Sequence, residues 1–259
     1  PVEGSTILVP SFRPDLIRMA DIAEDVGRSY GYNEIPTTAF KTSTQGGYSE
    51  EMKLEAKAGQ LCRGLGYDEI ITYSFISPAA FDQIRLSADS PLRKTLQIQN
   101  PLGEDTSIMR TIVLPSMLEI LGRNNAYHNR DVMLYELAKV YLPVEGQVLP
   151  EEPKMLMLGA YGDGMSFFHL KGQLEAIFAG LRLQKASYTA LKTNPSYHPG
   201  RCAAVSVGGV EVGVMGQVHP LVAKNYGIDA DVYCAEINFT KLLALQLPAA
   251  TYTPLPKYP

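Results

Sequence analysis

Four carboxylates near the beginning of this 259-residue chain have the types and spacing of metal ligands. Asp21, Glu24 and Asp25 stand at positions i, i+3 and i+4, so on a helix they share one face. Asp15 lies just ahead of them, where the incoming loop can fold back towards that face. Oxygen ligands of this kind suit a hard cation such as Mg²⁺, which takes few protein ligands and keeps several waters.

The other interpretation of these residues is a solvated helix start. Acidic side chains favour the positive end of the helix dipole, and acidic first turns are common. The four residues by themselves favour this second interpretation.

A second motif, Phe12-Arg13-Pro14-Asp15, matches the Phe-Arg-x-Asp/Glu pattern with which class II aminoacyl-tRNA synthetases hold ATP and the aminoacyl carboxylate. That use requires the motif to join two strands. Here Asp15 leads into a predicted helix, and Pro14 lacks the backbone N–H of a strand residue. We therefore interpret the match as accidental.

The remaining residues with catalytic potential are dispersed along the sequence. The four histidines do not pair with each other or with cysteine at the spacing of a metal site: His128, His169, His198 and His219. Loop or surface positions are the better interpretation for them. No phosphate-binding, nucleophile-elbow or dinucleotide-binding glycine motif occurs in a suitable context. Taken residue by residue, the sequence predicts no active site.

The composition is that of an ordinary globular protein, with 46% hydrophobic and 19% charged residues. No apolar stretch is long enough to span a bilayer. Three cysteines, an odd number with neither zinc nor disulfide spacing, favour a reducing compartment. The formal net charge is -4 and the 23 lysines and arginines are scattered. A broad nucleic-acid surface is therefore not expected, because phosphate neutralisation needs clustered cations.

The periodicity of apolar residues predicts helices and strands on either side of a linker. A helix is expected over residues 20–30, and the polar residues 38–47 are interpreted as the linker. Beyond it we expect helices over 49–65, 115–127 and 168–181, and strands over 70–75, 132–141, 155–161, 203–207 and 210–218, with another near Ser187. Gly208-Gly209 is a hairpin signal, since both positions of a two-residue turn favour positive φ. This pattern predicts the α+β class, with a mainly antiparallel sheet flanked by helices.

Taken together, several segments in order along nearly the whole chain resemble one family, the β subunit of bacterial phenylalanyl-tRNA synthetase. The matching segments are residues 9–15, 21–26, 30–36, 100–111, 114–118, 135–141, 168–172, 198–201 and 213–220. They include Tyr30-Gly31-Tyr32-Asn33-Glu34-Ile35-Pro36, Asn100-Pro101-Leu102-Gly103 and His198-Pro199-Gly200-Arg201. Each segment is weak alone, and the ordered set is specific.

The resemblance implies a domain plan for the chain, which is then expected to be an internal piece of a longer protein. Residues 1–37 resemble the C-terminal part of a small α/β module that binds Mg²⁺ at the interface with the α subunit. Residues 38–47 would be a linker, and residues 48–250 a catalytic-like domain with the class II synthetase sheet but without the residues for adenylation. Residues 251–259 resemble a connector to a C-terminal anticodon-binding domain.

The same resemblance carries a magnesium site over to this chain. Its ligands would be Asp15, Asp21, Glu24 and Asp25, the last of which stands where the family commonly has Glu. The resemblance thus favours the metal interpretation over the solvated helix start.

The activity that the resemblance implies belongs to an (αβ)₂ heterotetramer in the cytoplasm. There the α subunit uses ATP to ligate phenylalanine to tRNA(Phe), which binds to the full complex. The present chain would be a non-catalytic scaffold, with residues 100–111 and the helix after Pro115 as buried structure near the α subunit. Two alternatives are an adenylate-forming activity retained by the chain itself, and a nucleic-acid-binding module that places the N-terminal helix against a groove.

Overall fold

The computed structural model describes residues 2–3, 6–41, 46–248, 251–252 and 255. The chain divides into two compact units, residues 1–47 and residues 48–259. This division falls at the end of the linker predicted over residues 38–47. None of the helices in the described part of the chain is long and apolar enough to cross a bilayer.

The N-terminal unit consists of a short ladder and one longer helix. β1 (Val2–Glu3) pairs antiparallel with β2 (Thr6–Ile7). The helix α1 (Met19–Tyr30) follows, with a 3₁₀ turn η1 (Tyr32–Glu34) behind it. No residue of α1 is buried, so the helix packs into no hydrophobic core within this unit. The helix predicted over residues 20–30 is confirmed.

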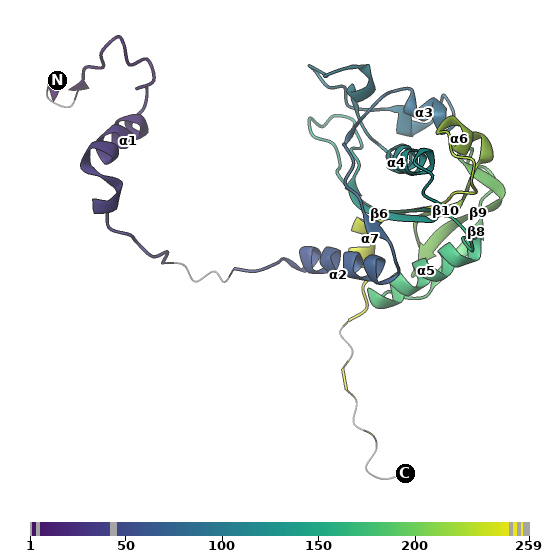
Figure 1. Cartoon of the computed structure of the whole chain (residues 1–259). Helices are drawn as coiled ribbons and strands as arrows, with labels where there is room; N and C mark the ends of the chain where they lie inside the picture. Colours follow the sequence, from purple (N-terminus) through teal and green to yellow (C-terminus); the bar gives the residue numbers. More distant parts are fainter. Residues whose placement is uncertain (1, 4–5, 42–45, 249–250, 253–254, 256–259) are drawn as a thin grey trace. The chain divides into compact units, whose positions relative to one another are not determined.

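A seven-stranded sheet forms the second unit (Figure 1). Its strand order is β3-β6-β7-β11-β10-β9-β8, and all neighbouring pairs are antiparallel except β3 and β6. The strands are β3 (Asp68–Glu69), β6 (Val132–Lys139), β7 (Lys154–Tyr161), β8 (Ala186–Ala190), β9 (Tyr197–Val207), β10 (Val210–Val218) and β11 (Tyr233–Asn238). A separate ladder joins β4 (Phe75–Ile76) to β5 (Ile108–Met109). The predicted α+β class with a mainly antiparallel sheet is confirmed.

Helices cover both faces of the large sheet. Side chains alternate along each strand, so neighbouring residues enter different cores. Along β11, Ala235 and Ile237 belong to the core beneath α2 (Glu50–Gly64), α5 (Phe167–Gly180) and α7 (Phe239–Ala244). Cys234 belongs to the core on the other face, with α4 (Leu114–Ala126) and α6 (Pro220–Asn225). The short helix α3 (Ala80–Gln83) and the 3₁₀ turns η2 (Pro91–Arg93) and η3 (Glu104–Thr106) lie between β4 and β5 in the chain.

The hairpin signal is confirmed, since Gly208 and Gly209 join β9 to β10 with φ angles of 58° and 80°. The helices predicted over 49–65, 115–127 and 168–181 correspond to α2, α4 and α5. β11 is a central strand that the sequence did not predict. It is buried on both faces and so lacks the alternation that marks a half-buried strand.

Two predictions about the region before α4 need correction. The single strand expected over residues 70–75 is wrong, because β3 ends at Glu69 and β4 begins at Phe75. Residues 100–111 were expected to be buried, but only their last part is, at Ile108, Arg110 and Thr111. The side chain of Leu102 is fully exposed.

Candidate functional site

Arg13 lies between two of the four predicted metal ligands. Its Nε and Nη2 donate to the two carboxylate oxygens of Asp15 at 3.0 and 2.6 Å, and its Nη1 lies 2.7 Å from Oδ2 of Asp25. These bonds to the guanidinium lower the pKa of both carboxyls below the ordinary value. Arg28 adds a second cation, with Nη2 at 3.0 Å from Oδ1 of Asp25.

The other two predicted ligands have different surroundings. Asp21 Oδ2 accepts the backbone N–H groups of Ile17 at 2.9 Å and Arg18 at 2.6 Å, so this carboxylate caps the start of α1. Glu24 lies on the exposed surface of the same helix.

In the described arrangement of the N-terminal unit, the four predicted ligands do not converge on one point. Among the residues that the structure describes, no three His, Cys, Asp or Glu side chains are grouped closely enough to hold a metal ion. Arginine side chains bond the carboxylates of Asp15 and Asp25, and backbone N–H groups bond Oδ2 of Asp21. Residues 12–15 lie in turns rather than between two strands, as expected if the Phe-Arg-x-Asp match is accidental.

A more distinctive feature is the segment of residues 70–76 between β3 and β4, in which apolar side chains face solvent and polar side chains face the interior. The apolar side chains of Ile71 and Tyr73 point to solvent, with 91% and 82% of their surface exposed. The polar side chains of Thr72 and Ser74 point inward. Thr72 Oγ1 lies 2.8 Å from Oε2 of Glu136, and Ser74 Oγ lies 3.5 Å from the Tyr141 hydroxyl. The usual placement of apolar and polar side chains is therefore reversed here.

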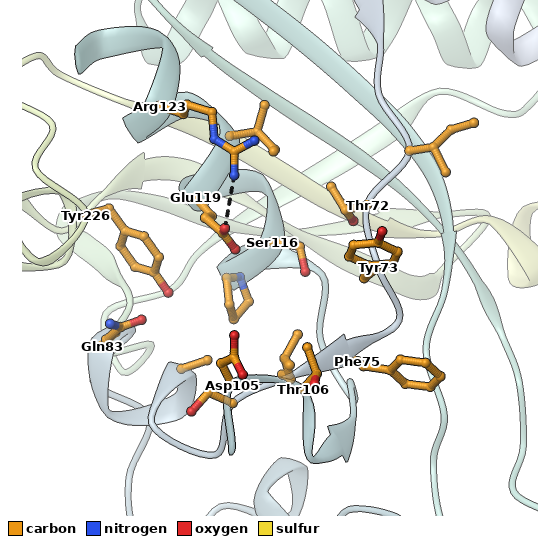
Figure 2. A pocket seen from close by; sticks show the side chains of 16 residues that line it. Thr72, Tyr73, Phe75, Gln83, Asp105, Thr106, Ser116, Glu119, Arg123 and Tyr226 are labelled. Carbon is orange, nitrogen blue, oxygen red and sulfur yellow. Dashed lines mark hydrogen bonds and ion pairs between the residues drawn. The ribbon is translucent and has the colours of Figure 1, made fainter. Parts of the chain in front are cut away.

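This segment forms one wall of a pocket of about 690 Å³, and α4 contributes another (Figure 2). Tyr73 and Phe75 stand on one side, and Gln83 and Tyr226 stand on the other. The hydroxyl of Tyr226 is buried and has no hydrogen-bond partner among the described residues.

The charged groups of the pocket come from η3 and α4. Asp105 belongs to η3, and Glu119 pairs with Arg123 at 3.4 Å on α4. No histidine or cysteine lines the pocket, so its hydroxyls have no imidazole beside them to act as a general base.

Buried acids lie behind the pocket, on the face of the sheet. Glu136 on β6 pairs with Arg110, and both side chains are almost completely buried. Glu236 on β11 accepts the backbone N–H of Val113 at 2.8 Å, just before α4 begins. Burial raises the pKa of Glu236 to about 7, although bonds from Val113 and Leu114 and the charge of Arg110 oppose the shift.

The cysteines and two of the histidines have structural surroundings. Cys62, Cys202 and Cys234 are free and buried, and burial raises the pKa of all three thiols, so they are not activated nucleophiles. His198 Nδ1 accepts the N–H of Gly200, and His219 Nδ1 accepts that of Leu221 at the start of α6. Nδ1 of His198 and Nδ1 of His219 are thus each bonded to a backbone N–H two residues further along the chain.

Comparison with known proteins gives this arrangement a context. The family model described as "Phenylalanyl tRNA synthetase beta chain CLM domain" matches residues 35–239, and the one described as "tRNA synthetase B5 domain" matches residues 2–32. The phenylalanine–tRNA ligase β subunit of Clostridium tetani is 42% identical over 262 residues, which cover 100% of this chain and 33% of that protein. The corresponding subunit of Geobacter sulfurreducens is 36% identical, with 98% and 33% covered.

Solved structures show the fold. The pyrrolysyl-tRNA synthetase of Desulfitobacterium hafniense superposes with a TM-score of 0.62 at 15% identity, over 75% of this chain and 68% of that one. At this identity the likeness concerns the fold alone. The chain spans about a third of the length of the curated relatives it matches. The matched models and the identities together show that the chain belongs to the family of phenylalanyl-tRNA synthetase β chains.

Proposed function

We propose that this chain is a non-catalytic scaffold of a phenylalanine–tRNA ligase. In this role it supports an α subunit that uses ATP to join phenylalanine to tRNA(Phe) in a cytoplasmic (αβ)₂ assembly, and tRNA(Phe) binds to the complete complex. The observation that carries the proposal is the reversed segment of residues 70–76, which presents Ile71 and Tyr73 to solvent. The name of the relatives, a β subunit, supports a partner subunit for that surface.

The exposed apolar side chains have a physical reason to be covered. Transfer of a side chain such as that of Ile71 out of water contributes about 1.5–3 kcal/mol. Phe75, 43% exposed, continues the row, so three apolar side chains lie along one edge of the pocket. We call Ile71, Tyr73 and Phe75 the apolar row. Contiguous apolar groups with a polar rim are typical of protein interfaces.

The domain plan and the magnesium ion stay predictions. In the plan, residues 1–37 belong to a metal-binding module, residues 48–250 to a catalytic-like domain and residues 251–259 to a connector that lies largely outside the described residues. A cation held by Asp15, Asp21, Glu24 and Asp25 requires Arg13 to give up its bonds to two of them. The ion would then link the module to the α subunit.

Binding to the α subunit tests the scaffold proposal. We expect Ile71→Asp/Tyr73→Asp, made in the full-length β subunit, to abolish co-purification with a co-expressed α subunit. The matched control is Val148→Asp/Leu149→Asp, since these two loop side chains are also exposed. If the Ile71→Asp/Tyr73→Asp variant co-purifies with the α subunit as well as the control variant does, the proposal is contradicted.

A separate assay tests the absence of chemistry in this chain. Pyrophosphate exchange with phenylalanine and ATP is expected only when the α subunit is present. Exchange by the 259-residue chain alone would instead support the adenylate-forming alternative.

A further inference from the structure

The ladder between β3 and β6 ends early, yet the chain continues beside β6. The parallel register pairs Asp68 with Leu134 and Glu69 with Tyr135, and the N–H of Ile70 still bonds the carbonyl of Tyr135 at 2.9 Å. In a regular parallel ladder the N–H of Thr72 would bond the next-but-one backbone carbonyl of β6. It bonds the side chain of Glu136 instead, at 3.1 Å from Oε1. A carboxylate thus takes the place of a strand acceptor.

Arg110 connects the same segment to β6 from a second direction. Its Nη1 donates to Thr72 Oγ1 at 2.7 Å and to the carbonyl of Tyr73 at 3.4 Å. Its Nε donates to the carbonyl of Lys139 at 2.9 Å, and its Nη2 lies 3.3 Å from Oε1 of Glu136. One guanidinium therefore bridges the backbone of the segment to the far end of β6.

We propose that Arg110 and Glu136 are positioning residues whose side chains hold residues 71–73, between the β3–β6 and β4–β5 ladders, with Thr72 inward, and so present Ile71 and Tyr73 of the apolar row to the partner subunit. The proposal rests on the proposed function only in taking the α subunit as that partner. Its physical basis is register. A slip of one residue in an extended segment moves every side chain to the other face, and would turn Ile71 and Tyr73 inward.

The chemistry of the buried pair favours this role over simple stabilisation. A buried ion pair gains little net stability, because desolvation of both charges offsets their attraction, whereas its directional bonds specify one arrangement. The side chains of Arg110 and Glu136 form hydrogen bonds with each other and with Thr72, Tyr73 and Lys139. Replacing both charges with apolar side chains is therefore expected to spare the fold and release the segment.

The test is the double substitution Arg110→Met/Glu136→Leu, with two independent readouts. Hydrogen–deuterium exchange of the peptide covering residues 70–76, measured on the 259-residue chain, reports whether the segment is held. Affinity for the α subunit, measured by calorimetry with the full-length β subunit, reports whether the apolar row is presented. We expect exchange of this peptide to become at least tenfold faster, and the affinity to fall at least tenfold at a temperature where both proteins are fully folded.

The matched control is Arg63→Met/Glu69→Leu, which removes an ion pair at the same edge of the sheet. That pair is about half exposed, and the hydrogen bonds of its side chains are with each other and with the Tyr135 hydroxyl rather than with residues 71–75. Exchange of the 70–76 peptide and affinity for the α subunit should both stay within twofold of the unsubstituted protein. An effect as large as that of the double substitution would overturn the proposal.

A third variant keeps the proposal testable if Arg110→Met/Glu136→Leu does not fold. Thr72→Val preserves shape and removes only the hydroxyl that contacts both charged residues. The bonds that Arg110 and Glu136 lose are expected to lower the melting temperature. Exchange of the 70–76 peptide and α binding are therefore compared at a temperature where the variant is fully folded, and we expect faster exchange and weaker binding.

The two readouts separate the possible failures. Unchanged exchange in the variants overturns the positioning role. Faster exchange with unchanged affinity also overturns it, because the segment would then not matter to the partner. If the unsubstituted β subunit itself does not bind the α subunit, the scaffold proposal fails, and exchange still decides whether the pair holds the segment.

Discussion

Glu236 and Val113 are 123 residues apart in the sequence, and the carboxylate of one accepts the backbone N–H of the other at 2.8 Å. Val113 is the residue just before α4, so the central strand β11 caps the helix that forms one wall of the pocket. The first N–H groups of a helix lack partners within the helix, and a buried carboxylate is a strong acceptor for them. This bond joins the sheet to α4 and sets the place of the helix.

The raised pKa of Glu236 predicts a dependence of stability on pH. Because the folded pKa of about 7 lies above the ordinary 4.5, the folded chain binds more protons between these values. The contribution of Glu236 is therefore fully present below about pH 4.5 and is lost as the pH rises through 7. The loss is on the order of 3 kcal/mol.

The variant Glu236→Gln isolates this effect. We expect the unfolding free energy of the unsubstituted chain, relative to this variant, to fall between pH 4.5 and pH 7.5 in urea titrations. Parallel pH profiles for the two proteins would show that the carboxyl does not titrate in this window.

Close packing of α4 against β7 predicts a large effect of one methyl group. A Cβ added to Gly159 would lie 2.6 Å from Cγ of Met117 and 3.0 Å from Cδ1 of Leu121. Gly159→Ala should therefore lower the unfolding free energy by about 1–3 kcal/mol. Gly172→Ala on α5 is the matched control, since nothing lies within 4 Å of its added Cβ. That control should raise stability by about 0.5–1 kcal/mol, and equal effects in urea unfolding would contradict this packing.

Arg13 predicts how the acidic residues of the N-terminal unit respond to divalent cations. Removing the guanidinium leaves Asp15 and Asp25 without their shared cationic partner, and it removes repulsion of an incoming Mg²⁺. We expect Arg13→Gln to bind Mn²⁺, used as a paramagnetic substitute for Mg²⁺, several-fold more tightly than the unsubstituted chain. Water-proton relaxation measures the binding.

Two further variants locate any change in Mn²⁺ binding. Arg18→Gln removes a charge from the same unit and should leave the affinity unchanged. Adding Asp25→Asn to Arg13→Gln should reverse the gain. Tighter binding by the unsubstituted chain than by Arg13→Gln would mean that the arginine does not compete with the cation.

The buried cysteines predict slow thiol modification in the folded chain. Burial raises the pKa of Cys62 to about 12 and that of Cys202 to about 11. The thiolate fraction at pH 8 is then on the order of a hundredfold or more below that of a free cysteine. A disulfide reagent should label all three cysteines rapidly only in urea. The added thiol of Ser187→Cys, on the exposed side of β8, should react at once, and similarly rapid reaction of the native thiols would contradict their burial.

Much of the fold could be predicted because its signals are local. The helix over residues 20–30, the hairpin at Gly208-Gly209 and the mainly antiparallel sheet follow from apolar periodicity and turn chemistry. β11 could not be predicted in this way, because a strand buried on both faces has no alternation. The segment over 70–75 was predicted as a strand because its residue types suit one. The N–H of Thr72, however, bonds the side chain of Glu136, 64 residues away, rather than a strand carbonyl.

The candidate site divides in the same manner. The sequence identified Asp15, Asp21, Glu24 and Asp25 as a group, but not the part played by Arg13, because its contacts depend on how the loop before α1 folds back. The apolar row was missed as well. Apolar and polar residues alternate over residues 71–75 of the sequence, but this pattern does not show which of the two faces is buried.

By itself the sequence determined the family, the fold class and the lack of a catalytic motif, since these depend on residue types in order along the chain. Only the tertiary structure decided that Glu136 replaces a strand acceptor for Thr72, and that Glu236 caps α4 with a raised pKa. The physical reason is that burial and hydrogen-bond partners are set by residues distant in sequence. A carboxylate in the sequence is the same whether it meets water, a guanidinium or the end of a helix.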